Sequence, residues 1–170
     1  LNGHLGVYER NTRPLTDFDA VAAKIASVKG VVRVIPTVQG QVLASAGNVA
    51  AGANVRGIRA EDIRARPIIA DNIRLGTLDD FKGRGSVIVG SRFASKFNVR
   101  PGDPIRLVSP QFNPTAFGSV PRSKQFRVAA VFEVGMFEYD SSFVFMPLEA
   151  AQIFFQSKNA VTNIEVFLAN

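Results

Sequence analysis

Cysteine is absent from this chain of 170 residues, and histidine occurs only once, as His4. One histidine without cysteine cannot build a zinc site of ordinary composition. No acid or thiol stands near His4 in the sequence, and no serine lies in a Gly-x-Ser-x-Gly elbow. The lack of thiols fits an oxidising compartment, although many cytosolic domains also lack cysteine. These absences predict a domain with no metal site and no nucleophilic centre.

Phosphate-binding and acid–base patterns are missing as well. Glycines recur between Gly83 and Gly90, but no Gly-Lys-Ser/Thr follows them and Gly85 leads into a strand rather than a helix. The pair Asp79-Asp80 has no base or metal ligand at a useful spacing, and neither has the group of carboxylates between residues 133 and 140. The sequence therefore predicts a domain that is not an enzyme and binds no cofactor.

Long apolar runs are also missing. No run of about 18 apolar residues occurs, so the chain itself is not expected to span a bilayer. It begins with Leu1 and carries no signal-peptide pattern, which is expected of a piece of a longer protein. A hydrophobic content of 46% with 20% charged residues is typical of a globular chain of one domain or two small lobes.

The formal net charge is +6, which attracts anionic surfaces. The basic residues are spread along the chain, and the tightest group, Arg64, Arg66 and Arg74, has Asp62 and Asp71 among it. A solvated, mildly basic surface is favoured over a nucleic-acid groove, and no nucleic-acid partner is expected. Binding to nucleic acid or to lipid headgroups is kept as an alternative function of the domain.

The order of periodic segments predicts an α+β fold. The two ends of the chain each read as strand–helix–strand, which favours a split-βαβ sheet built from both ends. In the first half we expect strands at residues 4–10, 31–46 (interrupted at Pro36 and Gly40) and 54–59, with a helix at 18–28. At the other end we expect a strand at 142–146, a helix at 148–156 with Pro147 in its first position, and a strand at 161–168.

The middle of the chain predicts a second set of elements. A helical turn at residues 61–66 is expected to stop at Pro67, and residues 72–80 show no clear periodicity. A buried strand at 87–90 precedes a helix that Ser91 is expected to cap and Asn98 to close. Residues 100–103 have the Pro-Gly centre of a type II turn. Strands at 105–108 and 126–132 follow.

The segment between those last two strands, residues 109–124, is sixteen residues long, more than a simple antiparallel connection needs. Pro110, Pro114 and Pro121 stiffen it toward extended conformations. Phe112, Phe117 and Val120 stand between the prolines. Two interpretations stay open: a stiff arm that captures a partner, or a lid whose phenylalanines fold back onto the domain.

Gly90, Ala94, Gly102 and Asp103 match a recurrent G-x-x-x-A … G-D-x-apolar pattern. With the strand, short helix and turn at residues 87–103, they resemble the periplasmic core domain of MacB-type ABC transporters, a family in which this pattern occurs. Residues 135–152 and residues 1–5 look more specifically like the lipoprotein-releasing permeases LolC and LolE. The resemblance covers essentially the whole chain.

The resemblance implies a periplasmic domain on the bacterial inner membrane. It implies a porter-like lobe (residues 1–60 and 136–170) and an inserted, smaller α/β sabre-like lobe (61–135) that carries a hook, the long loop 109–124. The domain would be excised from an integral membrane permease that works with a LolE-type permease and a separate LolD-type ATPase. That complex would hand its lipoprotein substrate to the soluble carrier LolA for sorting to the outer membrane.

The resemblance also assigns roles to residues of the loop. A hook that enters the apolar cavity of LolA would consist of Pro110, Gln111, Phe112, Asn113, Pro114, Phe117, Gly118, Val120 and Pro121. A basic pad at its feet would consist of Arg106, Arg122 and Lys124. Two departures matter: the spacing from Pro114 to Gly118 is longer than the pattern, and Ser123 replaces a longer polar side chain.

Other members of the same superfamily supply the alternatives. A MacB-like efflux domain would transmit force to a periplasmic adaptor, a LolE-like subunit would act on the substrate side, and fused LolC/LolE permeases also exist. A loop folded back onto its own lobe, with adaptor binding, would favour the efflux domain.

Overall fold

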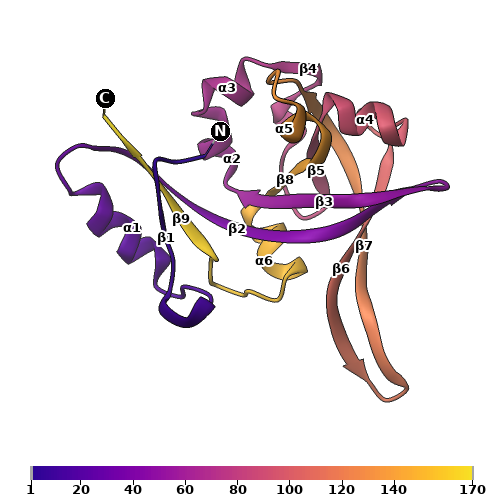
Figure 1. Ribbon diagram of the computed structural model, residues 1–170, viewed down its shortest axis with the longest axis horizontal. Coiled ribbons are helices and arrows are strands. Elements are labelled where there is room, and N and C mark those ends of the chain that lie inside the picture. Colours follow the sequence, from indigo (N-terminus) through magenta and orange to yellow (C-terminus); the bar gives the residue numbers. More distant parts are fainter. Residues whose placement is uncertain (1, 170) are drawn as a thin grey trace.

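A computed structural model describes residues 2–169, apart from the side chains of Thr12, Phe112 and Asn113. Across these residues one mixed sheet of nine strands carries helices on its faces (Figure 1). The strands are β1 (Leu5–Val7), β2 (Val31–Ala46), β3 (Val49–Ile58), β4 (Ile73–Gly76), β5 (Ser86–Gly90), β6 (Pro104–Thr115), β7 (Gly118–Phe132), β8 (Phe143–Pro147) and β9 (Asn163–Leu168). The helices are α1 (Phe18–Ala26), α2 (Ala60–Arg64), α3 (Pro67–Ala70), α4 (Ser91–Phe97), α5 (Phe137–Ser142) and α6 (Leu148–Phe154), with 3-10 turns η1 (Arg10–Thr12) and η2 (Leu78–Asp80).

The two ends of the chain meet in the sheet, whose order is β1-β9-β2-β3-β8-β5-β7-β4, with β6 joining β2 and β7. β1 and β2 each pair antiparallel with β9, so they run parallel to each other with β9 between them. This is the split-βαβ arrangement that the element order predicts. Strands from both segments share the one sheet, and the division into lobes at residues 61–135 stays a prediction.

The expected interruptions of the strand at Pro36 and Gly40 are wrong, because β2 runs unbroken from Val31 to Ala46. Pro36 keeps its place opposite Ile164 in the pairing with β9. Gly40 is a point of close approach, since a Cβ there would lie 2.5 Å from the Phe155 ring. A glycine in a strand can therefore mark tight packing rather than the end of the strand.

In the middle of the chain the structure differs from the elements predicted from the sequence in three places. Pro67 does not only end the first helical turn but begins α3, with its ring at the first helical position. The segment without periodicity contains β4 and η2. Residues 137–142 form α5, which no periodicity signalled, and the buried Asp140 at its centre accepts hydrogen bonds from the N–H groups of Val134 (2.8 Å) and Gly135 (3.0 Å).

The apolar side chains separate onto the two faces of the sheet. On β5, Val87 and Val89 belong to the core cluster that includes Leu148 and Phe154 of α6, whereas Ile88 belongs to the opposite cluster. That second cluster includes Ile63 of α2 and Ile69 of α3. Because successive residues of a strand face opposite sides, both faces of β5 are buried, and the sheet is the middle layer of the domain. No helix within residues 2–169 is long and apolar enough to cross a membrane.

A buried charge cluster joins β3, the α2–α3 junction and β9. Arg56 Nη1 lies 3.2 Å from Glu165 Oε1, and Arg66 Nη1 lies 3.6 Å from Glu165 Oε2. The side chains of the three residues are at most 7% exposed. Burial lowers the pKa of Arg66, and the neighbouring Glu165 carboxylate opposes that shift. Arg66 is therefore not part of the solvated surface that the sequence predicted.

Candidate functional site: the β6–β7 hairpin

The long loop predicted at residues 109–124 is instead a β-ribbon. β6 and β7 stay paired out to Thr115 opposite Gly118, with one irregularity between Ser109 and Phe112. The expectation of a sixteen-residue loop is wrong because prolines interrupt the alternating pattern of a strand without preventing a two-stranded ribbon. On such a ribbon a missing proline N–H can face an outer edge, where no further strand needs it.

The tip of the ribbon is shaped by three neighbouring residues. Gly118 has φ +114°, a conformation that favours glycine, and it pairs with Thr115 across the Ala116-Phe117 turn. The Thr115 hydroxyl donates to the Gly118 carbonyl (2.6 Å) and accepts from the Phe117 N–H (3.3 Å). These bonds present the Phe117 side chain to solvent, where it is 102% exposed.

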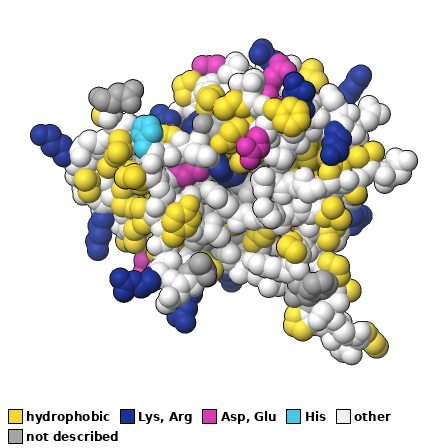
Figure 2. Space-filling model, in the orientation of Figure 1, with side chains coloured by type: hydrophobic (Ala, Val, Ile, Leu, Met, Phe, Trp, Pro, Cys, Tyr) yellow, Lys and Arg dark blue, Asp and Glu magenta, His cyan; other side chains and the backbone are white. Residues whose placement is uncertain are grey.

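The outer half of the ribbon stands away from the body and carries no charge. Residues 109–121 contain no Asp, Glu, Lys or Arg, and Figure 2 shows the projecting arm with hydrophobic side chains along it and at its end. The exposed members of the predicted hook are Pro110, Gln111, Pro114, Phe117, Gly118, Val120 and Pro121. The side chains of Phe112 and Asn113 lie outside the described residues. For Phe117 the folded-back alternative is wrong.

The inner half of the ribbon is held firmly in the core. Ile105, Leu107, Phe126 and Val128 are buried, and β6 also pairs with residues 43–45 of β2. An isolated two-stranded hairpin is marginally stable in water, so this root is what allows the arm to stay extended.

Arg122, which the resemblance placed in the basic pad, contacts the body of the domain. Its Nη1 donates to the carbonyls of Ile153 and Phe154, both at 2.8 Å, at the C-terminal end of α6. Helix-end carbonyls lack partners within the helix, and a cation is favourable beside them. Arg122 thus fastens β7 to α6 opposite Ser109, the residue where the projecting part begins.

The other two predicted pad residues differ in what they contact. Arg106 is exposed, and its Nη1 donates to the Ser123 hydroxyl at 3.1 Å across the ribbon. Lys124 donates to the Arg84 carbonyl, and its ammonium lies 5.0 Å from the centre of the Phe126 ring. Arg106 and Ser123 therefore form the solvent-facing polar part of the root, while Arg122 and Lys124 hold the root to its neighbours.

Replacing Arg122 with alanine should loosen the arm without unfolding the domain. The variant loses two charge-assisted hydrogen bonds, of a kind worth roughly 1.5–3 kcal/mol. We expect amide hydrogen exchange in residues 106–109 and 122–125 to become about tenfold faster or more. Arg127→Ala removes the same charge from an exposed position of the same strand and serves as the control. Equal exchange in both variants would show that the contact with α6 does not hold the arm.

Elsewhere, the residues singled out for chemistry have structural partners. His4 Nδ1 accepts a hydrogen bond from the Leu168 N–H at 2.9 Å, next to the Phe167 ring. Within residues 2–169 no three His, Asp or Glu side chains gather in a way that would hold a metal ion. The distinctive surface feature of the domain is thus the uncharged arm with its exposed aromatic tip.

The whole chain matches one family of transporter domains. A family model described as the MacB-like periplasmic core domain matches residues 2–170, and the chain belongs to this family. In fold it resembles the extracellular domain of the noncanonic ABC-type transporter YknZ from Gram-positive bacteria (TM-score 0.62, 17% identity, covering 97% of this chain and 82% of that one). It also resembles the periplasmic region of MacB from Actinobacillus actinomycetemcomitans (TM-score 0.60, 16% identity, 95% and 68%).

Sequence relatives narrow the class within that family. The chain is 28% identical over 144 residues to the lipoprotein-releasing system transmembrane protein LolC of Neisseria meningitidis serogroup B, which covers 84% of this chain and 34% of the relative. It is 30% identical over 101 residues to LolC of Xylella fastidiosa, covering 59% and 24%. The chain thus spans about a quarter to a third of these relatives and is a periplasmic domain of the LolC/MacB type.

Proposed function

We propose that this chain is the carrier-recruiting domain of a lipoprotein-exporting ABC transporter permease in the bacterial inner membrane. The observation that carries the proposal is the arm: an extended, uncharged ribbon braced by prolines, with Phe117 fully exposed at its tip. In this proposal the arm enters an apolar cavity of the periplasmic carrier LolA, which then receives the released lipoprotein. The domain is non-catalytic, and ATP hydrolysis belongs to a separate LolD-type subunit beside a LolE-type permease.

The geometry of the arm suits such an insertion. Ribbon pairing and prolines order it before it meets a partner, so less conformational entropy is lost on binding. Charged groups would have to be desolvated in an apolar cavity, and residues 109–121 bring none. Arg106, exposed at the root, is placed to meet an acidic rim and to speed the encounter at low salt.

The direct test is the affinity of the chain for purified LolA by titration calorimetry. Phe117→Ala should weaken binding by about 2 kcal/mol, roughly 30-fold in Kd, because buried aromatic anchors carry most interface energy. Phe137→Ala is the matched control, since Phe137 is also exposed (71%) but lies on α5. Equal affinities for wild type and both variants would refute the role of the tip.

The resemblance to MacB-type transporters implies one competing function, contact with a periplasmic adaptor during efflux. That likeness shows the fold alone, and the projecting arm favours the carrier. Binding of a MacB-type adaptor by the chain, unchanged by Phe117→Ala, together with no binding of LolA, would replace our proposal with this one.

A further inference from the structure

One edge of β2 is uncovered for a short stretch near the root of the arm. β9 pairs with β2 as far as Thr37, and β6 begins to pair at Leu43. The opposite edge is covered by β3 from Val38 onward. The Gln39 N–H points away from β3, because it donates to the Thr162 hydroxyl at 2.8 Å.

Gln41 lies in the middle of this uncovered stretch. Main-chain groups of a strand point to the same edge at every second residue, so the N–H and C=O of Gln41 face the same way as the Gln39 N–H. Within residues 2–169, the sheet pairing places no strand opposite Gln41 on this edge. A donor and an acceptor of the main chain are thus presented side by side.

A cavity of about 600 Å³ occupies the same place. This volume lies in the range of about 300–1,000 Å³ that is usual for ligand pockets. Residues 109–111, the beginning of the arm, form one wall, and Thr162 lies beside the other end of the gap. The ring of Phe155 lines the cavity and packs against Gly40 so closely that a side chain there would collide with it.

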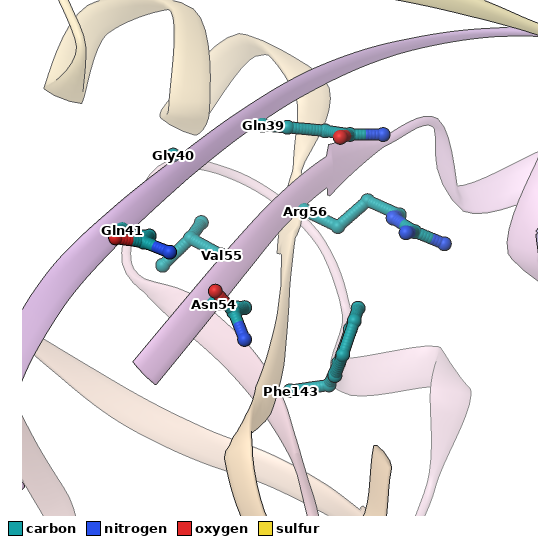
Figure 3. A pocket seen from close by; sticks show the side chains of 7 residues that line it. All are labelled: Gln39, Gly40, Gln41, Asn54, Val55, Arg56 and Phe143. Carbon is teal, nitrogen blue, oxygen red and sulfur yellow. The ribbon is translucent and has the colours of Figure 1, made fainter. Parts of the chain in front are cut away.

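The residues around the cavity carry amides and hydroxyls but no charge: they include Gln39, Gln41, Gln111, Ser109, Ser157 and Thr162. Figure 3 shows Gln39 beside Arg56 and Gln41 beside Asn54, where β2 and β3 line a neighbouring hollow of about 340 Å³. The segment Gln39–Gln41 is therefore a ridge between two hollows.

This lining is complementary to a polypeptide main chain. Amide side chains and a free strand edge pair with peptide N–H and C=O groups, as in strand addition. A charged ligand would lose its hydration and find no opposite charge among the lining residues. The two independent features, the unpaired edge and the uncharged lining, point to the same ligand class.

We propose that the cavity of about 600 Å³ beside Gln41, called the cleft below, binds a short, extended, uncharged segment of the protein captured by the arm. The main chain of that segment is hydrogen-bonded to Gln41. The inference rests on the proposed function, which identifies that protein as the carrier. Because residues 109–111 belong to both the cleft and the arm, a carrier seated on the arm reaches the cleft without a change of shape in this domain.

Hydrogen exchange on the wild-type chain gives the first test. The Gln41 amide is expected to exchange readily in the free domain and at least about tenfold more slowly with saturating LolA. The same experiment with Phe117→Ala at saturating LolA should still slow exchange at Gln41, because the cleft contact is separate from the tip.

Binding by variants gives the second test. Gln41→Glu adds a charge to the cleft at an exposed side chain, and Gln41→Pro removes the main-chain donor. Each is expected to raise the Kd for LolA about tenfold. Asn48→Asp makes the same charge change as Gln41→Glu in the β2–β3 turn and should leave the Kd unchanged.

The outcomes separate the two proposals. If wild type binds LolA but neither Gln41 exchange nor the affinity of Gln41→Glu changes, the cleft inference is wrong and the arm keeps its proposed function. If wild type does not bind LolA at all, both proposals fail.

Discussion

A chain in which residues 110–121 are replaced by Asn-Gly will bind LolA at least about 100-fold more weakly than wild type and will remain folded. Ser109 and Arg122 face each other in the ribbon, so a two-residue turn between them closes a shorter hairpin in the existing register. The variant loses Phe117 and Val120, and with them the exposed apolar side chains on which the proposed insertion depends.

We expect this truncation to leave the rest of the domain folded as in wild type. Ile105, Leu107 and Phe126 stay in the core, and Arg122 keeps its hydrogen bonds to the end of α6. We therefore expect the melting temperature to change by less than about 3 °C, since every described side chain among the removed residues is exposed. In a second variant a glycine–serine chain of equal length replaces residues 110–121. This variant loses the apolar side chains of the arm but keeps its length, so it separates the effects of the two. Carrier affinity close to wild type in the truncated chain would end the proposed role of the arm.

Glu165→Gln will have the largest effect on stability, lowering the free energy of unfolding by about 3–5 kcal/mol. The Glu165 carboxylate is the acid that faces both Arg56 and Arg66 in the buried cluster. Its removal leaves two guanidinium groups in a low-dielectric site with no opposite charge beside them. Arg56 Nη2 keeps its hydrogen bond to Asn2 Oδ1 (2.9 Å), but that amide oxygen carries no charge that would replace the carboxylate.

Urea unfolding of wild type and two variants measures this effect. The control is Glu149→Gln, whose carboxylate lies 2.6 Å from Arg84 Nη2 on the surface, with both side chains about 60% exposed. Exposed pairs contribute little, so the control should lose less than about 1 kcal/mol. A loss for Glu165→Gln no larger than that of the control would mean that the buried cluster does not stabilise the fold.

Local chemistry explains which elements were predictable from the sequence. Arg100 and Asp103 close the predicted turn through the Asp103 N–H (3.0 Å to the Arg100 carbonyl), with Gly102 at φ +97°. Asn98 ends α4 in the left-handed conformation, as its position predicts. The turn and the helix end each depend on a few neighbouring residues, so both can be predicted from the local sequence.

The features that were missed depend on partners far along the chain. The ribbon was hidden because prolines break the alternation of a strand, and its pairing becomes visible only with the partner strand in place. The sequence left a projecting arm and a folded-back lid both open, and the contact of Arg122 with α6 joins residues about thirty positions apart. The meeting of Arg56, Arg66 and Glu165 spans an even longer separation, which residue spacing does not encode.

The unbroken course of β2 has a mechanical consequence. The strand pairs with β9 over its first residues and with β6 over residues 43–45, so one continuous strand, curved in Figure 1, links the end strands of the domain with the foot of the projecting finger. If the end strands were tilted, we would expect the hydrogen-bonded ladders on β2 to pass that tilt on to the finger.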